Sequence, residues 1–229
     1  IFTSLNLGDI SDIKYEIVSI KTRGSKGNKL YDTKQTYYKN IYISFSKIYE
    51  DKAIIKKMNC SSKDNVLEIG IGTGSSLQYY PDKTKVVGID LSPDMLDLAK
   101  KRIIKDSVQN KHILLMNGEE LTFADNTFDK VVGMYVVSVT QDPKKLIEEM
   151  KRVCKSDGDI YIVNHFSNET DNRLVKMFEK GLMPISKLLG WKPYFPFTEF
   201  NEYADLNVQE MSKVNIFDYW NIIHATNNK

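Results

Sequence analysis

The feature that most constrains the fold is a short apolar run that leads directly into three glycines at alternate positions. Val66-Leu67-Glu68-Ile69 has the length and apolar character of a buried strand, and Gly70, Gly72 and Gly74 follow it. Because glycine adopts positive φ without strain, this spacing lets the chain turn sharply and lets a ligand approach the backbone closely. In open α/β sheets, ligands bind at such turns, at the carboxyl ends of the strands.

Further strands and helices alternate along the chain on either side of this turn. One helix has a clear start, with Ser92 as its N-cap and Pro93 at its first position. The predicted strands cover residues 66–69, 85–89, 112–116, 128–137, 159–163, 208–214 and 219–225, and the predicted helices cover residues 93–105 and 143–154. This alternation predicts a mostly parallel, seven-stranded sheet with helices on both faces, a Rossmann-like α/β fold.

The chain is expected to consist of an N-terminal extension, residues 1–58, and an α/β domain, residues 59–229. Within the extension, residues 34–58 carry apolar side chains at steps of three and four, surrounded by lysines. This pattern predicts an amphipathic helix. Such a helix either lies at a membrane interface or packs over the active site as a lid, and one helix can do both.

Composition excludes several classes of function. The net charge is only +2, which does not suggest the basic face of a nucleic-acid-binding protein. The two cysteines, Cys60 and Cys154, lie far apart, so we expect neither a zinc site nor a disulfide, and no other metal site is expected. No apolar run reaches the roughly 18–20 residues that span a bilayer, and no signal peptide is visible. We therefore expect a cytoplasmic protein whose membrane association, if any, is peripheral.

The glycine turn does not fit the dinucleotide-binding pattern G-x-G-x-x-G/A. In that pattern the last position would be Ser75 when counted from Gly70, and Leu77 when counted from Gly72. The spacing G-x-G-x-G after the acidic Glu68 instead resembles motif I of the class I S-adenosylmethionine-dependent methyltransferases. A helix N-terminus is expected to follow, where amide groups and the helix dipole would suit the carboxylate of the methionine part.

Three further segments carry the same resemblance. Asp90 ends the second strand, where a carboxylate can accept hydrogen bonds from both ribose hydroxyls. Asn117 follows the third strand where the family commonly has Asp, and its amide oxygen can accept the same bond from the adenine amine. Tyr135 lies at the tip of the fourth strand, beside the expected methyl group. The resemblance implies S-adenosylmethionine as cofactor, S-adenosylhomocysteine as product, and the following cofactor-binding residues: Glu68, Gly70, Gly72, Thr73, Gly74, Asp90, Leu91, Met95, Asn117, Gly118, Glu119 and Tyr135.

The segments that flank this core resemble the bacterial phospholipid N-methyltransferases. The fifth strand ends in Val163-Asn164-His165-Phe166, and residues 190–196 read Gly-Trp-x-Pro-x-Phe-Pro. The resemblance runs from about Tyr37 to the C-terminus. It implies stepwise methylation of phosphatidylethanolamine toward phosphatidylcholine, with a phospholipid partner, no nucleic-acid partner, and peripheral association with the inner face of the membrane. We expect a monomer.

Other readings stay open at this point. The core resembles the ubiquinone and menaquinone C-methyltransferases equally well, so the acceptor can also be a quinone precursor or another lipid such as an ornithine lipid. The intact glycine turn and Asp90 disfavour a binding protein without catalytic activity.

Methylation of an amine places two requirements on the catalytic site. An alkylammonium must lose a proton before its nitrogen can attack, and His165 is the candidate acceptor, directly or through a water or tyrosine, with Asn164 beside it. The alternative is a histidine that packs beneath the site. The growing cation also needs aromatic faces, each worth about 0.5–2 kcal/mol. Tyr135, Tyr42 and Tyr49 are the candidates, although the last two can equally be core residues of their helix.

Overall fold

The computed structural model describes residues 45–106, 109–167, 194–214 and 220–229, and the single positions 177, 180, 181 and 184. For residues 45–50 and 203 only the backbone is described. Predictions that concern residues 1–44, including Tyr42, and the segment around Trp191 therefore lie outside the described residues.

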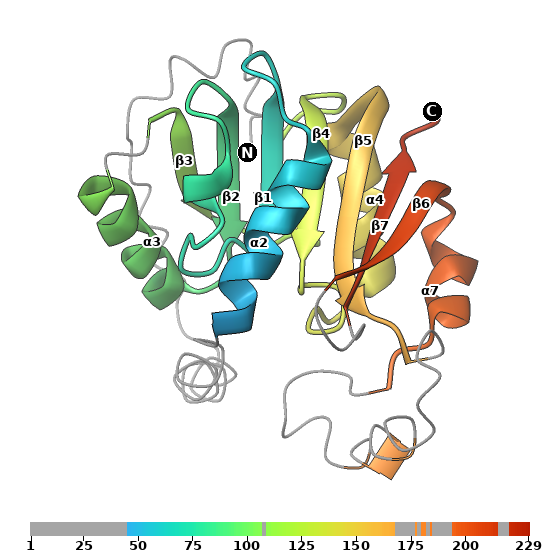
Figure 1. Ribbon diagram of the computed structural model, residues 1–229. Helices are drawn as coiled ribbons and strands as arrows, with labels where there is room; N and C mark the ends of the chain where they lie inside the picture. Colours follow the sequence, from blue (N-terminus) through green and yellow to red (C-terminus); the bar gives the residue numbers. More distant parts are fainter. Residues whose placement is uncertain are drawn as a thin grey trace, which may run out of the picture.

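The strands form one seven-stranded sheet in the order β3-β2-β1-β4-β5-β7-β6 (Figure 1). The first five strands in this order are parallel, whereas β7 runs antiparallel to both β5 and β6. The strands are β1 (Asn65–Ile69), β2 (Lys85–Asp90), β3 (Lys111–Leu115), β4 (Phe128–Met134), β5 (Cys154–His165), β6 (Asn207–Val214) and β7 (Trp220–Thr226). The predicted fold is confirmed, and the order reverses between β1 and β4, which places the ligand-binding crevice at their carboxyl ends.

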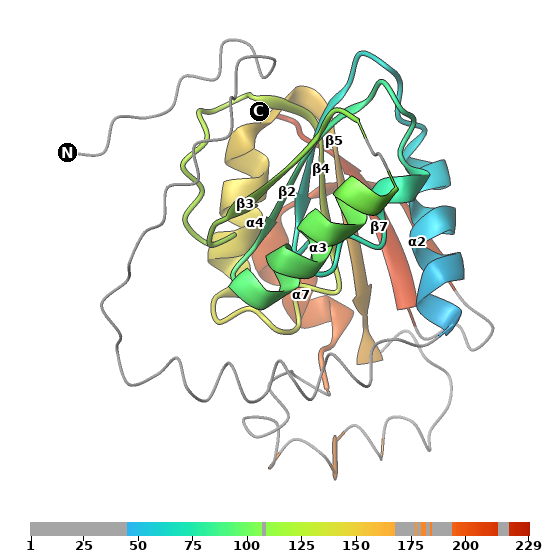
Figure 2. The same ribbon diagram turned by 90° about the vertical axis from the view of Figure 1, so that its left-hand side faces the viewer.

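Helices cover both faces of the sheet (Figure 2). One face carries α2 (Phe45–Met58), the short 3-10 helix η2 (Leu77–Tyr79) and α3 (Pro93–Lys105), and the other carries α4 (Pro143–Val153) and α7 (Phe197–Ala204). Each face has its own apolar cluster, which we call the α2-side and α4-side clusters. The α2-side cluster includes Ile54, Ile55, Met58, Leu77 and Leu96, and the α4-side cluster includes Leu146, Met150, Phe200 and Ala204.

Helix α3 has the predicted boundaries and the predicted start. The Ser92 hydroxyl accepts a hydrogen bond from the Met95 N–H at 3.3 Å, and Pro93 occupies the first helical position. The helix N-terminus expected after the glycine turn belongs to η2, which is only three residues long. Because η2 is so short, it has almost no helix dipole. An anionic group bound at this turn would therefore depend on individual backbone N–H groups.

Two strand boundaries differ from the prediction by three residues or more. Strand β4 ends at Met134, three residues early, because Tyr135 adopts a left-handed backbone with φ of 62°. Strand β5 begins at Cys154, five residues early, because the chain enters it directly from α4. The pairing of β4 with β5 absorbs these residues through a register shift after Phe128.

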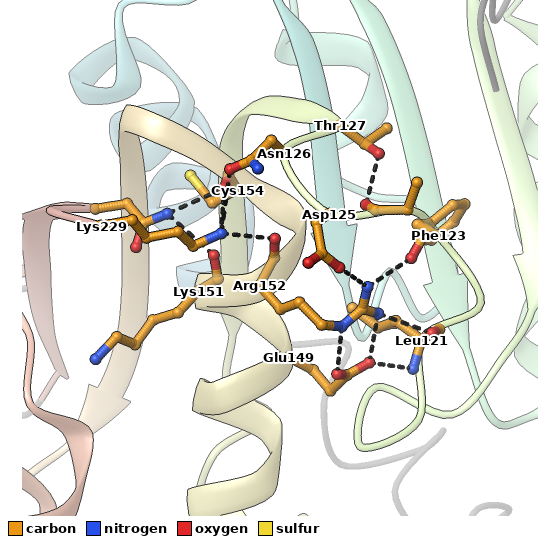
Figure 3. Close-up of polar contacts among 12 residues, drawn as sticks. Leu121, Phe123, Asp125, Asn126, Thr127, Glu149, Lys151, Arg152, Cys154 and Lys229 are labelled. Carbon is orange, nitrogen blue, oxygen red and sulfur yellow. Dashed lines mark hydrogen bonds and ion pairs between the residues drawn. The ribbon is translucent and has the colours of Figure 1, made fainter. Parts of the chain in front are cut away.

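Arg152, near the end of α4, holds the loop between β3 and β4 (Figure 3). Its guanidinium group donates five hydrogen bonds: two to the carboxylate of Glu149, one to the carboxylate of Asp125, and one each to the carbonyls of Leu121 and Phe123, all at 2.7–2.9 Å. The same Glu149 accepts the N–H of Leu121 at 2.7 Å. This loop includes Asn117, in the predicted adenine site, so Arg152 holds the chain segment that follows that site.

Asn227 and Lys229 donate hydrogen bonds to backbone carbonyls where α4 ends and β5 begins. The side-chain amide of Asn227 donates to the carbonyls of Lys151 and Cys154, both at 3.0 Å. The ammonium of Lys229 donates to the carbonyls of Arg152 at 2.7 Å and Cys154 at 3.1 Å. These contacts satisfy carbonyl groups that a helix leaves without partners at its C-terminus.

Two further expectations concern the thiols and the membrane. Cys60 and Cys154 are free, and burial raises the pKa of each thiol to about 12, so both stay protonated. Within the described part of the chain, no helix is both long enough and apolar enough to cross a membrane.

The contacts of Arg152 predict a measurable loss of stability. Arg152→Ala should lower the free energy of unfolding by about 2–3 kcal/mol, because two loop carbonyls lose their donor and Glu149 loses its charged partner. Denaturant unfolding measures this change. The matched control on the same helix is Lys145→Ala, whose ion pair with Glu120 is largely exposed, so its loss should leave the free energy of unfolding almost unchanged. Equal losses in the two variants would refute the assignment.

Candidate active site

The glycine turn after β1 has the conformation that its sequence predicts. Gly70, Gly72 and Gly74 have φ values of 77°, 56° and 70°. The N–H groups of Gly70 and Ile71 both donate to the carbonyl of Ile89, at 2.8 and 2.9 Å, so the turn is tied to the end of β2. The backbone of the turn is therefore fixed beside the neighbouring strand.

Asp90 joins this turn to the start of α3. One carboxylate oxygen accepts the N–H of Gly72 at 2.9 Å, and the other accepts the N–H of Ser92 at 2.8 Å. Each oxygen of a carboxylate can accept a second hydrogen bond. A half-buried Asp90 can thus hold both loops and still accept hydrogen bonds from a pair of ribose hydroxyls. The structure fits the role predicted for this residue.

Glu68 organises the segment that follows the glycine turn. Its side chain is 2% exposed and accepts hydrogen bonds from the hydroxyls of Ser76, at 2.7 and 2.9 Å, and of Tyr80, at 2.9 Å. Burial, followed by the nearby charge of Glu68, raises the pKa of Tyr80 well above its usual value, so Tyr80 stays a donor. These bonds satisfy a carboxylate inside an apolar strand. Its predicted contact with the cofactor stays a prediction.

Helix α2 contacts the cofactor turn through a residue that sequence reasoning missed. Asp51 is 1% exposed, and its carboxylate accepts the hydroxyl proton of Ser75 at 2.6 Å. A buried acid requires a partner, but nothing in the sequence shows that this partner lies 24 residues away. The N-terminal helix and the glycine turn therefore form one packed unit.

Two residues after β3 shape the expected adenine site. The side-chain oxygen of Asn117 accepts the N–H of Glu119 at 3.0 Å, and a second lone pair stays available for an adenine amine. The carboxylate of Glu119 accepts the hydroxyl of Thr140 and the N–H groups of Gln141, at 2.8 Å, and Asp142, at 3.1 Å. Glu119 thus ties this loop to the start of α4, which is the role that the structure gives it.

The remaining predicted cofactor residues lie in the segments that follow β1, β2 and β3. Gly118 lies so close to β1 that a Cβ atom would come within 2.8 Å of Ile69 Cγ2. Thr73 and Met95 are half-buried, whereas Leu91, directly after Asp90 at the end of β2, is 52% exposed. An apolar side chain exposed beside the ribose site is a suitable surface for an adenine ring.

At the ends of β4 and β5, two of the predicted catalytic residues meet around a third aromatic residue. The N–H of Tyr135 donates to the carbonyl of Val163 at 2.7 Å, and its ring lies edge-to-face with Trp220, with centroids 4.6 Å apart. His165 pairs with Trp220 in the β5–β7 register, and their rings are 5.6 Å apart at 88°. The imidazole is 0% exposed, so it lies beneath the surface of the site.

Of the other catalytic candidates, the structure describes Asn164, which is not part of this group. Neighbouring residues of a strand point to opposite faces, so Asn164 shares the α4 side with Ile162, whereas His165 lies on the α2 side. The Asn164 amide instead donates to the carbonyl of His165 at 2.9 Å. Tyr49 belongs to α2, but its side chain is outside the described residues, as is Tyr42.

The geometry of Asp90 predicts a loss of cofactor affinity. Asp90→Ala should weaken binding of S-adenosylmethionine by roughly 10- to 100-fold, since the ribose and the Gly72 N–H both lose their acceptor. Calorimetry measures this change. Asp94→Ala, which removes an exposed carboxylate in the first turn of the same α3, should leave the affinity unchanged. Wild-type affinity in the Asp90 variant would remove Asp90 from the cofactor site.

Comparison with known proteins identifies the family of the chain. Residues 67–162 match the family model described as a methyltransferase domain. The phosphatidylethanolamine N-methyltransferase of Cereibacter sphaeroides is 38% identical over 148 residues, which cover 64% of this chain and 72% of that protein. The demethylmenaquinone methyltransferase of Lactobacillus johnsonii is 29% identical over 182 residues, which cover 76% of this chain and 65% of that protein.

A solved structure supports the fold. The crystal structure of a SAM-dependent methyltransferase from Aquifex aeolicus superimposes with a TM-score of 0.65 at 21% identity, covering 84% of this chain and 97% of that one. The match to the methyltransferase domain and the 38% identical relative, together with the glycine turn and the Asp90 carboxylate, identify the cofactor as S-adenosylmethionine. The chain belongs to the class I S-adenosylmethionine-dependent methyltransferases, in the family that includes the phosphatidylethanolamine N-methyltransferase of Cereibacter sphaeroides.

Proposed function

We propose that the protein methylates the amine of phosphatidylethanolamine, and of its mono- and dimethyl derivatives, to give phosphatidylcholine. The observation that carries this proposal is the 38% identity to the phosphatidylethanolamine N-methyltransferase of Cereibacter sphaeroides, which extends over 72% of that protein. The arrangement of Tyr135, His165 and Trp220 at the carboxyl edge of the sheet supports it, because it combines a base with aromatic rings.

The residues around the crevice fit the cofactor and divide its binding among them. Asp90 would hold the ribose, Asn117 the adenine amine, and the glycine turn the methionine part. When bound, S-adenosylmethionine supplies an electrophilic methyl group. The chain's own contribution is to hold cofactor and acceptor in line, which lowers the entropy cost of their reaction.

The acceptor must lose a proton before its nitrogen can attack, and His165 is the group proposed to take that proton. A primary amine of this kind is protonated at neutral pH. Because the imidazole of His165 is fully buried beside Trp220, we propose that the proton reaches it through a water molecule or a neighbouring hydroxyl. Tyr135, half-buried beside Trp220, lies in a position to offer its ring to the cation.

Access to a lipid acceptor is proposed to occur by peripheral association of a monomer with the inner face of the membrane. In the described part of α2, Ile54, Ile55 and Met58 pack into the α2-side cluster, whereas Lys52 and Lys56 are exposed. This part of the helix thus offers the membrane a basic surface rather than an apolar stripe. Exposed lysines attract anionic headgroups by about 1 kcal/mol each near the surface.

A quinone precursor is the second candidate acceptor. The similarity to the demethylmenaquinone methyltransferase of Lactobacillus johnsonii covers a larger share of this chain, 76%, than the lipid enzyme does, although at lower identity. A carbon acceptor of this kind would place no demand on the aromatic rings for binding a cation.

Incubation with labelled S-adenosylmethionine and liposomes that contain phosphatidylethanolamine tests the proposal. Chromatography should resolve mono-, di- and trimethylated lipid, and the Asp90→Ala variant should form far less of each because its cofactor site is impaired. Absence of lipid product from a protein that binds the cofactor would refute the lipid assignment. A parallel reaction with a demethylmenaquinone-type quinone would then show whether the second candidate is correct.

The proposed role of His165 predicts a rate effect that is separate from binding. His165→Gln keeps a polar side chain of similar size but removes the base, and should slow methyl transfer by at least about 100-fold, with cofactor affinity almost unchanged. Single-turnover kinetics and calorimetry measure the two quantities. His112→Gln on β3, far along the sheet, is the control and should keep its rate. A His165 variant with the full rate would exclude this residue from the mechanism.

A further inference from the structure

Trp220 contacts both candidate catalytic residues, although the sequence pattern assigns it no role in the site. It is the first residue of β7, which begins at the edge of the sheet where β4 and β5 end (Figure 1). Its ring lies 4.6 Å from that of Tyr135 and 5.6 Å from that of His165, nearly perpendicular to both. Because β7 runs antiparallel to β5, its first residue brings an indole ring into contact with both Tyr135 and His165.

Exposure distinguishes Trp220 from the histidine next to it. His165 is fully buried, whereas Trp220 and Tyr135 are half-buried and pack against the margin of the α2-side cluster. An acceptor that enters at this edge therefore meets the two aromatic rings before it meets the imidazole.

The backbone conformation of Tyr135 indicates that surrounding contacts fix the position of its ring. A bulky aromatic residue rarely adopts a φ of 62°, and such strain persists only where surrounding contacts determine it. Here the described contacts include the hydrogen bond from its N–H to the Val163 carbonyl and the edge-to-face packing with Trp220. Trp220 therefore orients the ring of Tyr135 at the end of β4.

Repeated methylation of an amine requires a site that binds cations, which the rings of Trp220 and Tyr135 can provide. Each added methyl group removes an N–H donor from the headgroup, while the positive charge returns when the product forms. Binding must then shift from hydrogen bonds to cation–π attraction, for which an indole is the best of the natural rings. Two rings at 84° to each other form a corner that offers a cation more than one face.

We propose that Trp220 determines acceptor specificity: with Tyr135 it forms an aromatic corner that holds the partly methylated ammonium headgroup for the later methyl transfers. This inference rests on the proposed function, since it concerns the acceptor of that same site. It assigns to Trp220 a contact with the acceptor and not with the cofactor.

The test compares Trp220→Ala and Trp220→Phe on liposomes that contain either phosphatidylethanolamine or its dimethyl derivative. Trp220→Ala should raise KM for the dimethyl lipid about tenfold and for the unmethylated lipid about twofold, because the loss of one ring face matters most where hydrogen bonds are fewest. Trp220→Phe keeps an aromatic ring, so KM for the dimethyl lipid should rise less than in Trp220→Ala. Affinity for S-adenosylmethionine should stay unchanged. Phe197→Ala, which removes a half-buried ring from the α4-side cluster, is the matched control and should affect both lipids alike.

Two results would overturn the inference. One is an equal rise in KM for both lipids in Trp220→Ala. The other is a Trp220→Phe variant that has the melting temperature of the wild type but shows the same KM values for the two lipids as Trp220→Ala. Binding of tetramethylammonium to the protein saturated with S-adenosylhomocysteine, followed by NMR, separates this inference from the proposed function. If the wild type methylates no lipid but binds this cation and Trp220→Ala does not, the aromatic corner stands and the lipid assignment fails; equal binding by the two proteins refutes the corner.

Discussion

The cofactor crevice depends on one carboxylate that joins two backbone turns. Asp90 accepts the N–H of Gly72 through one oxygen and the N–H of Ser92 through the other, so the turn after β1 and the start of α3 cannot move independently. Charge-assisted hydrogen bonds of this kind are shorter and stronger than neutral ones. The two turns are therefore fixed relative to each other at the carboxyl ends of β1 and β2.

Two more carboxylates stabilise the same region from within the protein. Glu68 and Asp51 are both almost fully buried, and the described hydrogen bonds of each come from hydroxyl groups: Ser76 and Tyr80 for Glu68, and Ser75 for Asp51. A buried carboxylate without donors would cost several kcal/mol, so these acids require the segment after the glycine turn to fold against β1 and α2. They act as constraints on shape, and they connect α2 to the cofactor turn.

The sequence predicted the elements whose signal is local. Strand periodicity located the members of the sheet, and the Ser92-Pro93 pair located the start of α3 to the residue. It could not predict features that depend on contacts distant in the chain. The early end of β4 follows from the strained backbone of Tyr135, which exists because β5 and β7 hold it. The bond from Asp51 to Ser75 likewise joins two segments whose sequences carry no sign of each other.

The same limit explains why sequence reasoning found His165 but not Trp220. A histidine at the end of a predicted strand is recognisable as a catalytic candidate because its chemistry is rare among side chains. A tryptophan at the start of an apolar strand is indistinguishable from a core residue until the strand order is known. Only the position of β7 between β5 and β6 brings Trp220 opposite His165, at the edge where the acceptor enters. The shared core of the fold can thus bind one cofactor, while the antiparallel strands added to it provide the surface on which acceptor specificity is built.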